Sequence, residues 1–360
     1  MNVDIIEYLE QAVAQGASDL HLCANSAPMI RKHGVLIQLT EPVLDAEACR
    51  DLIYSILTEN QRARFEETWE LDFAVVVENL GRFRANAHYS RGTAEAVFRY
   101  IPENVPSLKT LGLPPIVHQL CSLERGLVLV TGMTGSGKTT TLASMVEEIN
   151  VNRTGVIVSV EDPIEYVFKH KLCRVKQREI GSDTKSFPAA LRHVLRQDPD
   201  VILISEMRDL ETIAAAITAA ETGHLVLATL HTMDAPKAID RIVDAFPPDQ
   251  QGQIIAQLAN ALQAIIAQRL LPRADGKGRV ACAEVMVMND GVRSCLRDRR
   301  FQQILSMIEI GSRDGMITFD ESICDLYAQG LITQEEALIN ARDRNRILTA
   351  APVKRGLHLF

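Results

Sequence analysis

Hydrophobic and polar residues follow two different patterns along the 360-residue chain, and the change occurs near residue 100. Before it, apolar positions recur with a helical period over residues 3–15, up to Gly16, and then alternate with polar ones as in half-buried strands. A helix combined with such strands predicts a small α+β domain. The predicted strands are residues 18–22, 71–77, 82–88 and 94–101, with a hairpin turn at residues 90–92.

Beyond residue 115 the apolar residues form four short continuous runs, which helical stretches separate. Runs without alternation that are rich in β-branched residues are typical of parallel strands buried on both faces of a sheet. The pattern therefore predicts an α/β domain. Its core strands are residues 127–130, 156–160, 201–204 and 225–230; helices are expected over residues 211–222, before Gly223, and from about residue 291, including one capped by Thr333.

Four of the 14 prolines fall between residues 101 and 115. Proline lacks an amide donor and biases the residue before it away from the helical conformation. We interpret this segment, residues 101–115, as a linker between an N-terminal domain of residues 1–100 and a C-terminal domain of residues 116–360.

Composition and charge narrow the class of protein. Asp and Glu number 46 against 38 Lys and Arg, a net charge of −8 that argues against nucleic acid as a partner, because phosphate binding usually requires basic charge. No apolar stretch approaches the roughly 18–20 residues that span a bilayer. The first residues carry acids where a signal peptide carries bases. We therefore expect a cytoplasmic protein that does not insert into a membrane.

The strongest chemical signal is the segment GMTGSGKT at residues 132–139, which matches the phosphate-loop pattern G-x-x-x-x-G-K-[ST] in full. It follows a predicted strand and precedes a helical stretch, as a loop that cradles phosphates must. Lys138 is expected to reach the β- and γ-phosphates, and the Thr139 hydroxyl to bind Mg²⁺. The chain is thus predicted to bind a nucleoside triphosphate through Gly132, Thr134, Gly135, Ser136, Gly137, Lys138, Thr139 and Thr140.

The other three core strands each end in a polar residue, namely Glu161, Glu206 and His231. Ligands of open α/β sheets lie beyond the carboxyl ends of the strands, so these side chains are predicted to meet the phosphate loop. Hydrolysis requires a group that activates water and carboxylates that hold the metal's water ligands. We favour Glu161 as the base and Glu206 as the metal-side acid, although the spacing also allows the reverse. His231 would contact the γ-phosphate.

These motifs resemble those of the secretion-type ATPases, most closely the type IV pilus retraction ATPases of the PilT family. In that family VEDPIE is called the Asp box, ISEMRD contains the Walker B element, and GHLVLATLHT is the His box. The likeness runs from about residue 3 to about residue 345. It is carried by ASDLHL (17–22), GRFRANA (81–87), AVFRYIP (96–102), RGLVLVTGMTGSGKTTTLA (125–143), VEDPIEY (160–166), SFPAALRHVLRQDPDVILISEMRDLETI (186–213), ETGHLVLATLHT (221–232) and RIVDAFP (241–247).

The resemblance implies a PAS-like N-terminal domain joined to a RecA-like ATPase domain, assembled as a homohexamer. It also implies ATP and Mg²⁺ as ligands, and a pilus platform protein at the inner membrane as partner. The function it implies is hydrolysis of ATP to power pilus retraction and twitching motility. The protein would then be cytoplasmic and peripheral to the inner membrane through the pilus machinery.

Arginines of the N-terminal region are further candidates, because a phosphoryl-transfer site gains roughly 10³–10⁵ in rate from an arginine, often supplied by another subunit. Arg82 and Arg84 share one strand face by the two-residue period of a strand. By resemblance, some of Arg82, Arg84, Arg91 and Arg99 reach nucleotide at an interface between N- and C-terminal domains. The alternative is a solvated basic strand.

Alternative functions also follow from the sequence. The chain begins at the PAS-like segment and has no C-x-x-C pair, which favours the retraction type over pilus assembly or type II secretion ATPases. Residues 291–296, GVRSCL, keep little of the family's A-I-R-N-L-I-like motif, and Ser205 stands where the family usually has Gly. An accessory paralogue beside a principal retraction ATPase is therefore one alternative. A RecA-like ATPase that translocates nucleic acid or secreted protein is the other.

Overall fold

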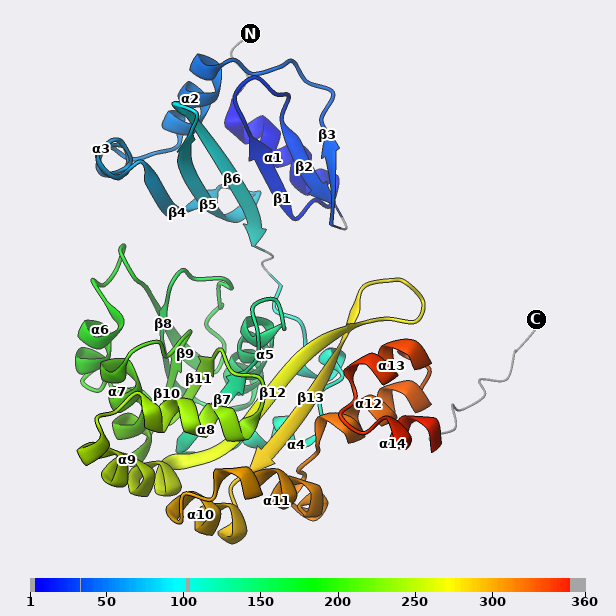
Figure 1. Cartoon of the computed structure of the whole chain (residues 1–360). Coiled ribbons are helices and arrows are strands. Elements are labelled where there is room, and N and C mark those ends of the chain that lie inside the picture. The colour runs from blue at the N-terminus through cyan, green and yellow to red at the C-terminus, as the bar shows by residue number, and fades with distance from the viewer. Residues whose placement is uncertain (1–3, 33, 102–103, 350–360) are drawn as a thin grey trace. The chain divides into compact units, whose positions relative to one another are not determined.

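The computed structural model describes residues 4–32, 34–101 and 104–349, and it divides into two compact units (Figure 1). The chain passes from the first unit to the second between Asn104 and Val105, and Glu165–Val167 are also grouped with the first unit. Residue 3 of the predicted first helix, residues 102–103 of the predicted linker and residues 350–360 lie outside the described residues. Throughout the described ranges, no helix combines the length and the apolar character needed to cross a membrane.

In the first unit the described residues form a six-stranded antiparallel sheet in the order β3-β2-β1-β6-β5-β4. Helices α1 and α2 pack on one face, whose apolar side chains form a single core with Phe83 and Phe98. The opposite face is polar, as the alternation of β5 predicts. The bounds are α1 Ile5–Ala14, β1 Asp19–Leu22, β2 Met29–Lys32, β3 Val35–Gln38, α2 Ala46–Ser55, α3 Glu59–Thr68, β4 Glu70–Val77, β5 Gly81–Ser90 and β6 Thr93–Ile101.

In the second unit the described strands form a seven-stranded sheet in the order β13-β12-β7-β11-β10-β8-β9. All neighbours are parallel except β12 and β13, which pair as a long antiparallel hairpin. The four predicted core strands are confirmed as a parallel sheet, and the predicted α/β class with it. The strands are β7 Gly126–Thr131, β8 Gly155–Glu161, β9 Cys173–Glu179, β10 Val201–Ile204, β11 Leu225–Leu230, β12 Leu262–Pro272 and β13 Arg279–Val287.

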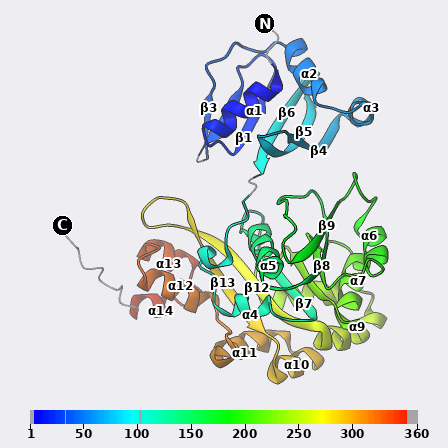
Figure 2. The same ribbon diagram turned by 180° about the vertical axis from the view of Figure 1, so that it is seen from behind.

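Helices cover both faces of this sheet, which is why its strands are uninterrupted apolar runs. Helices α4 and α5 lie on one face, seen from the front in Figure 2, while α7, α8 and α9 lie on the other. Along β7, Leu127 and Leu129 enter the core shared with α7 and α9. The helices are α4 Ile116–Leu120, α5 Lys138–Asn152, α6 Phe187–Val194, α7 Leu210–Glu221, α8 Ala235–Asp244 and α9 Pro248–Ala261.

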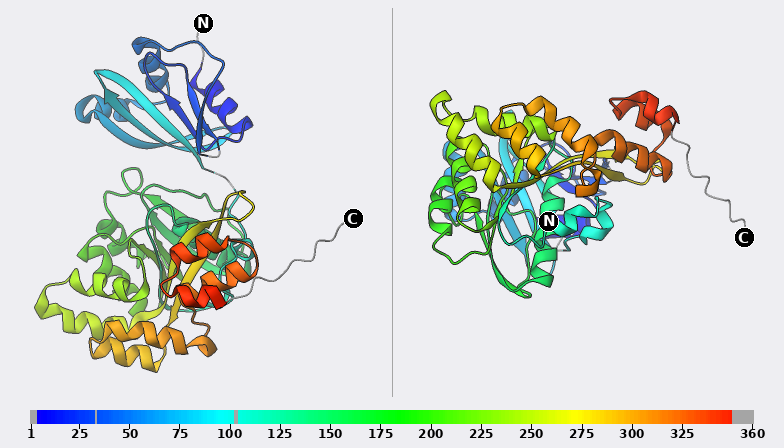
Figure 3. Two further views of the ribbon diagram at one scale, coloured as in Figure 1. Left: turned by 45° about the vertical axis from the view of Figure 1, so that its right-hand side comes forward. Right: turned by 90° about the horizontal axis from the view of Figure 1, so that it is seen from below.

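The C-terminal part of the described chain is helical from Asp290, one residue before the predicted start. Helices α12 and α13 pack on the β12–β13 hairpin through Phe319, Ile323 and Ala337 (Figure 3). Thr333 caps α13 as predicted, its side chain accepting from the Glu336 amide. These helices are α10 Asp290–Arg297, α11 Ile304–Ile310, α12 Phe319–Ala328, α13 Gln334–Asn340 and α14 Arg344–Thr349.

Much of the predicted linker folds as part of the second unit. Residues 105–115 belong to that unit, and within them Leu108–Leu111 form a 3₁₀ helix beside α5. Leu108 is 2% exposed, and the Ser144 hydroxyl of α5 donates to the Pro106 carbonyl. Prolines therefore mark the change of unit without making the whole segment a free connection.

Candidate nucleotide site

The phosphate-loop motif forms the turn between β7 and α5. Gly132, Gly135 and Gly137 all adopt positive φ, at 149°, 79° and 88°, which side-chain-bearing residues rarely do. These conformations let the loop double back so that α5 begins at Lys138, directly after Gly137. The glycines of the motif are thus explained by the backbone path. Thr134 is exposed on the loop, and Thr139 and Thr140 are half-buried on the first turn of α5.

Lys138 is buried, and its Nζ donates to the carbonyls of Gly132 at 2.7 Å and Met133 at 3.1 Å. The ammonium group therefore sits against the start of the loop. Beside it, the Ser136 Oγ atom is buried and has no hydrogen-bond partner among the described residues. An unused hydroxyl, an ammonium and a helix N-terminus form a donor set suited to phosphate oxygens.

Two residues that sequence reasoning missed reach this loop from the β12–β13 hairpin. Gln268 of β12 donates from Nε2 to the Ser136 carbonyl at 2.9 Å. Arg279, the first residue of β13, points its Nη1 at the Gly135 carbonyl at 3.5 Å. Both residues lie more than a hundred positions from the phosphate loop in the sequence, and the pairing of β12 with β7 brings them next to it. The one local signal was a polar residue inside an apolar run at Gln268.

Glu161 ends β8 and is 4% exposed. Its Oε1 accepts hydrogen bonds from the Ser159 hydroxyl at 2.6 Å and from Gln177 Nε2 at 3.0 Å. The carboxylate is therefore fixed by neighbouring polar groups of β8 and β9. This placement at a strand end matches the prediction.

Glu206 lies two residues beyond β10, between two basic side chains. Its Oε1 is 2.7 Å from Arg208 Nε and 3.2 Å from His231 Nε2, and its side chain is 20% exposed. Burial by itself raises the pKa of Glu206, but the hydrogen bond from Arg208 and the charges of His231 and Arg208 outweigh it and lower the pKa below its ordinary value. Glu206 therefore stays ionised into acidic solution. His231, predicted from its place after β11, is joined to it directly.

Strand register aligns these groups along one edge of the sheet. Thr131 of β7 pairs with Leu230 of β11, and Ile204 of β10 pairs with both Ala228 and Val160. The carboxyl ends of β7, β11, β10 and β8 are thus side by side, and each is followed by a predicted site residue. Thr139 and Glu206 supply oxygen donors of the kind that Mg²⁺ takes together with phosphates and water. Among the described residues no cluster of three or more His, Cys, Asp and Glu could hold a metal by itself.

The candidate arginines of the first unit lie on the polar face of its sheet. Arg84 of β5 pairs with Arg99 of β6, which pairs with Asp19 of β1, and residues paired in this way share one face. Asp19 is 4% exposed and accepts from Arg99 Nε at 2.8 Å, and Arg31 of β2 lies 4.0 Å away on its other side. We call Arg31, Asp19, Arg99 and Arg84 the arginine row. Arg82 is half-buried two residues from Arg84, whereas Arg91 lies in the hairpin turn, seven residues further along.

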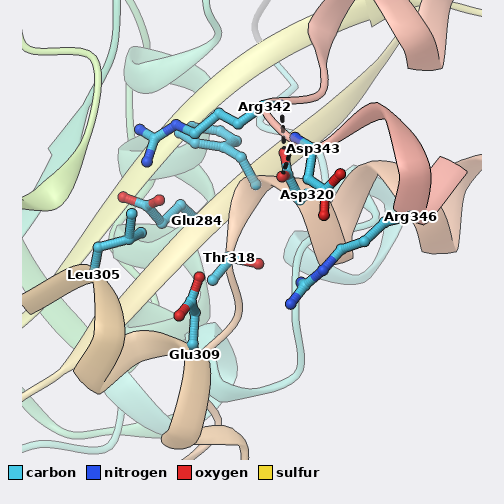
Figure 4. Close-up of a pocket in the computed structure, with 9 residues that line it drawn as sticks. Glu284, Leu305, Glu309, Thr318, Asp320, Arg342, Asp343 and Arg346 are labelled. Carbon is cyan, nitrogen blue, oxygen red and sulfur yellow. Dashed lines mark hydrogen bonds between the residues drawn. The ribbon is translucent and has the colours of Figure 1, made fainter.

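A separate pocket of about 230 Å³ lies where the C-terminal helices meet β13 (Figure 4). Buried Glu284 accepts from the Ala235 amide at the start of α8, and burial raises its pKa. Asp320 accepts from the amides of Arg342 and Asp343, and Arg342 Nη2 reaches Asp234 at 3.0 Å. These contacts fasten the C-terminal helices to α8, the helix that follows His231. None of the residues predicted for the nucleotide site lines this pocket.

Comparison with known proteins agrees with this geometry. The family described as type II/IV secretion system protein matches residues 2–302. The chain is 46% identical to the type IV pilus retraction ATPase PilT of Pseudomonas aeruginosa, over 96% of this chain and 99% of the relative. It is 42% identical to the type IV pilus ATPase PilU of the same organism, over 94% and 88% of the two chains.

A crystal structure of the pilus retraction motor PilT with bound ADP superposes with a TM-score of 0.89, covering 96% of this chain and 98% of that one at 46% identity. The predicted resemblance is therefore confirmed. The family match spans both sheets and every strand end described above, from β1 to beyond His231. The chain belongs to the type II/IV secretion system protein family.

Proposed function

We propose that this protein is an ATP hydrolase that powers retraction of a type IV pilus, working as a ring of six identical subunits. The observation that carries the proposal is the alignment of a complete phosphate loop with Glu161, Glu206 and His231 along one sheet edge. The identity to a pilus retraction ATPase over nearly the whole chain supports the choice of reaction and of machine.

In this proposal the loop binds the triphosphate of ATP. Lys138 and the amides of residues 132–140 contact the phosphates, with the hydroxyls of Thr134, Ser136, Thr139 and Thr140 beside them. Thr139 and Glu206 would hold Mg²⁺, Glu206 partly through water, and the bound ion would neutralise charge on the phosphates. The lowered pKa of Glu206 suits this role, because a metal-side acid must remain ionised.

The same feature supports Glu161 as the base. A group that is held ionised by Arg208 and His231 is a weak proton acceptor, so Glu206 is the poorer base of the two acids. Glu161 therefore takes the proton of the attacking water. His231, joined to Glu206, would orient toward the γ-phosphate and respond when it is lost.

The arginines of the first unit complete the site from a neighbouring subunit. The three arginines of the row are half-buried or exposed on the polar face of their sheet. An arginine that enters in trans would stabilise charge on the transferring phosphoryl group. A site that a neighbouring subunit completes would make ATP hydrolysis depend on assembly of the ring.

Substitutions in the second unit test the proposal directly. Lys138→Ala should lose ATP binding, and Glu161→Gln should bind ATP yet lose roughly 10²–10⁴-fold in turnover, the usual contribution of a general base. Glu206→Gln should instead raise the Mg²⁺ concentration needed for half-maximal activity. Binding is measured by titration with fluorescent ATP and turnover by phosphate release. Normal hydrolysis by Lys138→Ala would rule out this site.

The place of the protein in the pilus machine has two readings. As principal motor it would act on a platform protein of the inner membrane from the cytoplasmic side. The alternative is an accessory role beside a second retraction ATPase, which is consistent with the altered segment 291–296 and with 42% identity to PilU, against 46% to PilT. In the structure, Arg293 of that segment donates to the Ala259 carbonyl at the end of α9. Retraction in cells that lack this chain decides: complete loss indicates the principal motor, and partial loss the accessory one.

A further inference from the structure

The side chain of Gln268 lies against the phosphate loop and forms hydrogen bonds to both the loop and helix α5. Its Nε2 donates to the Ser136 carbonyl at 2.9 Å, and its Oε1 accepts from the Thr141 hydroxyl at 2.7 Å. The residue is 3% exposed and both hydrogen bonds are buried. A single amide group therefore joins strand β12, the loop and the first turn of α5.

Strand β12 packs closely against both ends of the loop, through the backbone of Gln268 at one end and its side chain at the other. A Cβ atom on Gly132 would lie 2.4 Å from the Gln268 carbonyl oxygen, and one on Gly137 would lie 2.8 Å from Gln268 Nε2. At Gly132 a side chain would meet backbone, and at Gly137 it would displace the Gln268 amide group. Both glycines also adopt positive φ, which other residues rarely do.

We propose that Gln268 is a positioning residue of the nucleotide site, which holds the loop amides in the arrangement that receives the phosphates. The inference rests on the proposed binding of ATP at this loop. Glutamine meets the need because Ser136 offers an acceptor and Thr141 a donor, and its amide group answers both at neutral pH. An ionised carboxylate lacks the donor, and a thioether lacks both strong functions.

The decisive variant is Gln268→Glu. At neutral pH its second carboxylate oxygen would face the Ser136 carbonyl oxygen, and we expect roughly ten- to a hundredfold weaker binding of fluorescent ATP, the cost of a buried polar group without a partner. The KM for ATP should rise more than kcat falls, because Lys138, Glu161 and Glu206 are untouched. As pH falls, the buried carboxyl takes up a proton and regains a donor, so affinity should recover toward that of the unchanged protein. A purely structural role would not produce that recovery.

Matched variants separate the possible failures. Gln263→Glu places the same change on the same strand, against Gly126 at the start of β7, and should leave affinity unchanged. If Gln268→Glu does not fold, Gln268→Met removes both bonds without adding charge, and Thr141→Val removes one. Unfolding temperatures without nucleotide show whether each variant is intact.

Two outcomes overturn different claims. Unchanged ATP affinity and KM in Gln268→Met, together with lost binding in Lys138→Ala, would refute the role of Gln268 and leave the proposed function standing. Unchanged binding in Lys138→Ala would refute the nucleotide site itself. Weakened binding in Gln268→Met at a preserved unfolding temperature supports the inference.

Discussion

The sheet edge of the second unit and the arginine row of the first both gather polar groups, but by different means. At the edge, each group lies at or just beyond the end of a parallel strand, so that strand order lines up Glu161, Glu206 and His231 along the edge that also carries the phosphate loop. In the row, Arg84, Arg99, Asp19 and Arg31 come from four antiparallel strands and meet because those strands pair in one register. The edge depends first on the order of the strands, whereas the row depends on the register in which antiparallel strands pair.

The difference has a physical consequence for how each region is held. A slip of one residue between β5 and β6 would turn the side chains of one strand to the apolar face and break the row. At the edge, the charged groups are also secured locally, Lys138 by loop carbonyls and Glu206 by Arg208. In the row, the buried Asp19 carboxylate secures Arg99.

The largest effect should come from breaking the row itself. Because an arginine supplied in trans is worth roughly 10³–10⁵ in rate, Arg99→Ala or Arg84→Ala should lower ATP turnover by about 10³-fold. ATP binding should change far less. Turnover is measured by phosphate release, and Arg64→Ala on the exposed surface of α3 is the control that should retain activity.

Mixing subunits tests whether the arginine acts in trans. Lys138→Ala keeps the row and Arg99→Ala keeps the loop, so a mixture should regain activity that neither has alone. No recovery, in mixtures shown by sedimentation to form joint assemblies, would mean that the row serves its own subunit or is only a solvated basic face. Activity that stays constant over dilution through ring dissociation would lead to the same conclusion.

The contrast also explains which features the sequence could predict. Strands 201–204 and 225–230 match their predicted bounds, because short apolar runs between turn residues identify buried strands without knowledge of their partners. Strands β12 and β13 escaped prediction, and Gln268 and Arg279 with them, since their role depends on pairing with β7 far away in the chain. Arg31 and Asp19 escaped as members of a row for the same reason. Sequence motifs were enough to predict the residues of the sheet edge, whereas the arginine row is recognised only once the register of the strands is known.

A smaller effect should follow from removing the carboxylate that secures the row. Asp19→Asn keeps the size of the side chain but loses the charge-assisted hydrogen bond to Arg99 Nε, so that the guanidinium is no longer fixed. A hydrogen bond to a charged group is worth about 1.5–3 kcal/mol, and Arg99 is partly exposed, so turnover should fall roughly tenfold. Asp19→Glu should retain more of the ATP turnover than Asp19→Asn does. An Asp19→Asn protein as active as the unchanged one would show that Arg99 needs no support.

The smallest effect concerns the edge and appears chiefly in acid. Arg208→Gln removes the strongest contact that lowers the pKa of Glu206, while the burial that raises it remains. Glu206 in the variant should therefore take up a proton at a higher pH, and the acid side of the pH–rate profile should move upward. At neutral pH, where both proteins keep Glu206 ionised, turnover should differ only a few-fold.

The pH dependence of the free energy of unfolding should change in the same direction in the Arg208→Gln protein. A carboxyl whose pKa is lowered by folding stabilises the folded state above its unfolded pKa, and this contribution is lost as pH falls through the folded pKa. Arg208 is 68% exposed, so the difference in the free energy of unfolding at neutral pH should be under about 1 kcal/mol and should vanish in acid. Arg192→Gln, which breaks the exposed pair with Glu211, should leave the pH–rate profile in place. If the two variants give the same profile, protonation of Glu206 does not limit activity in acid.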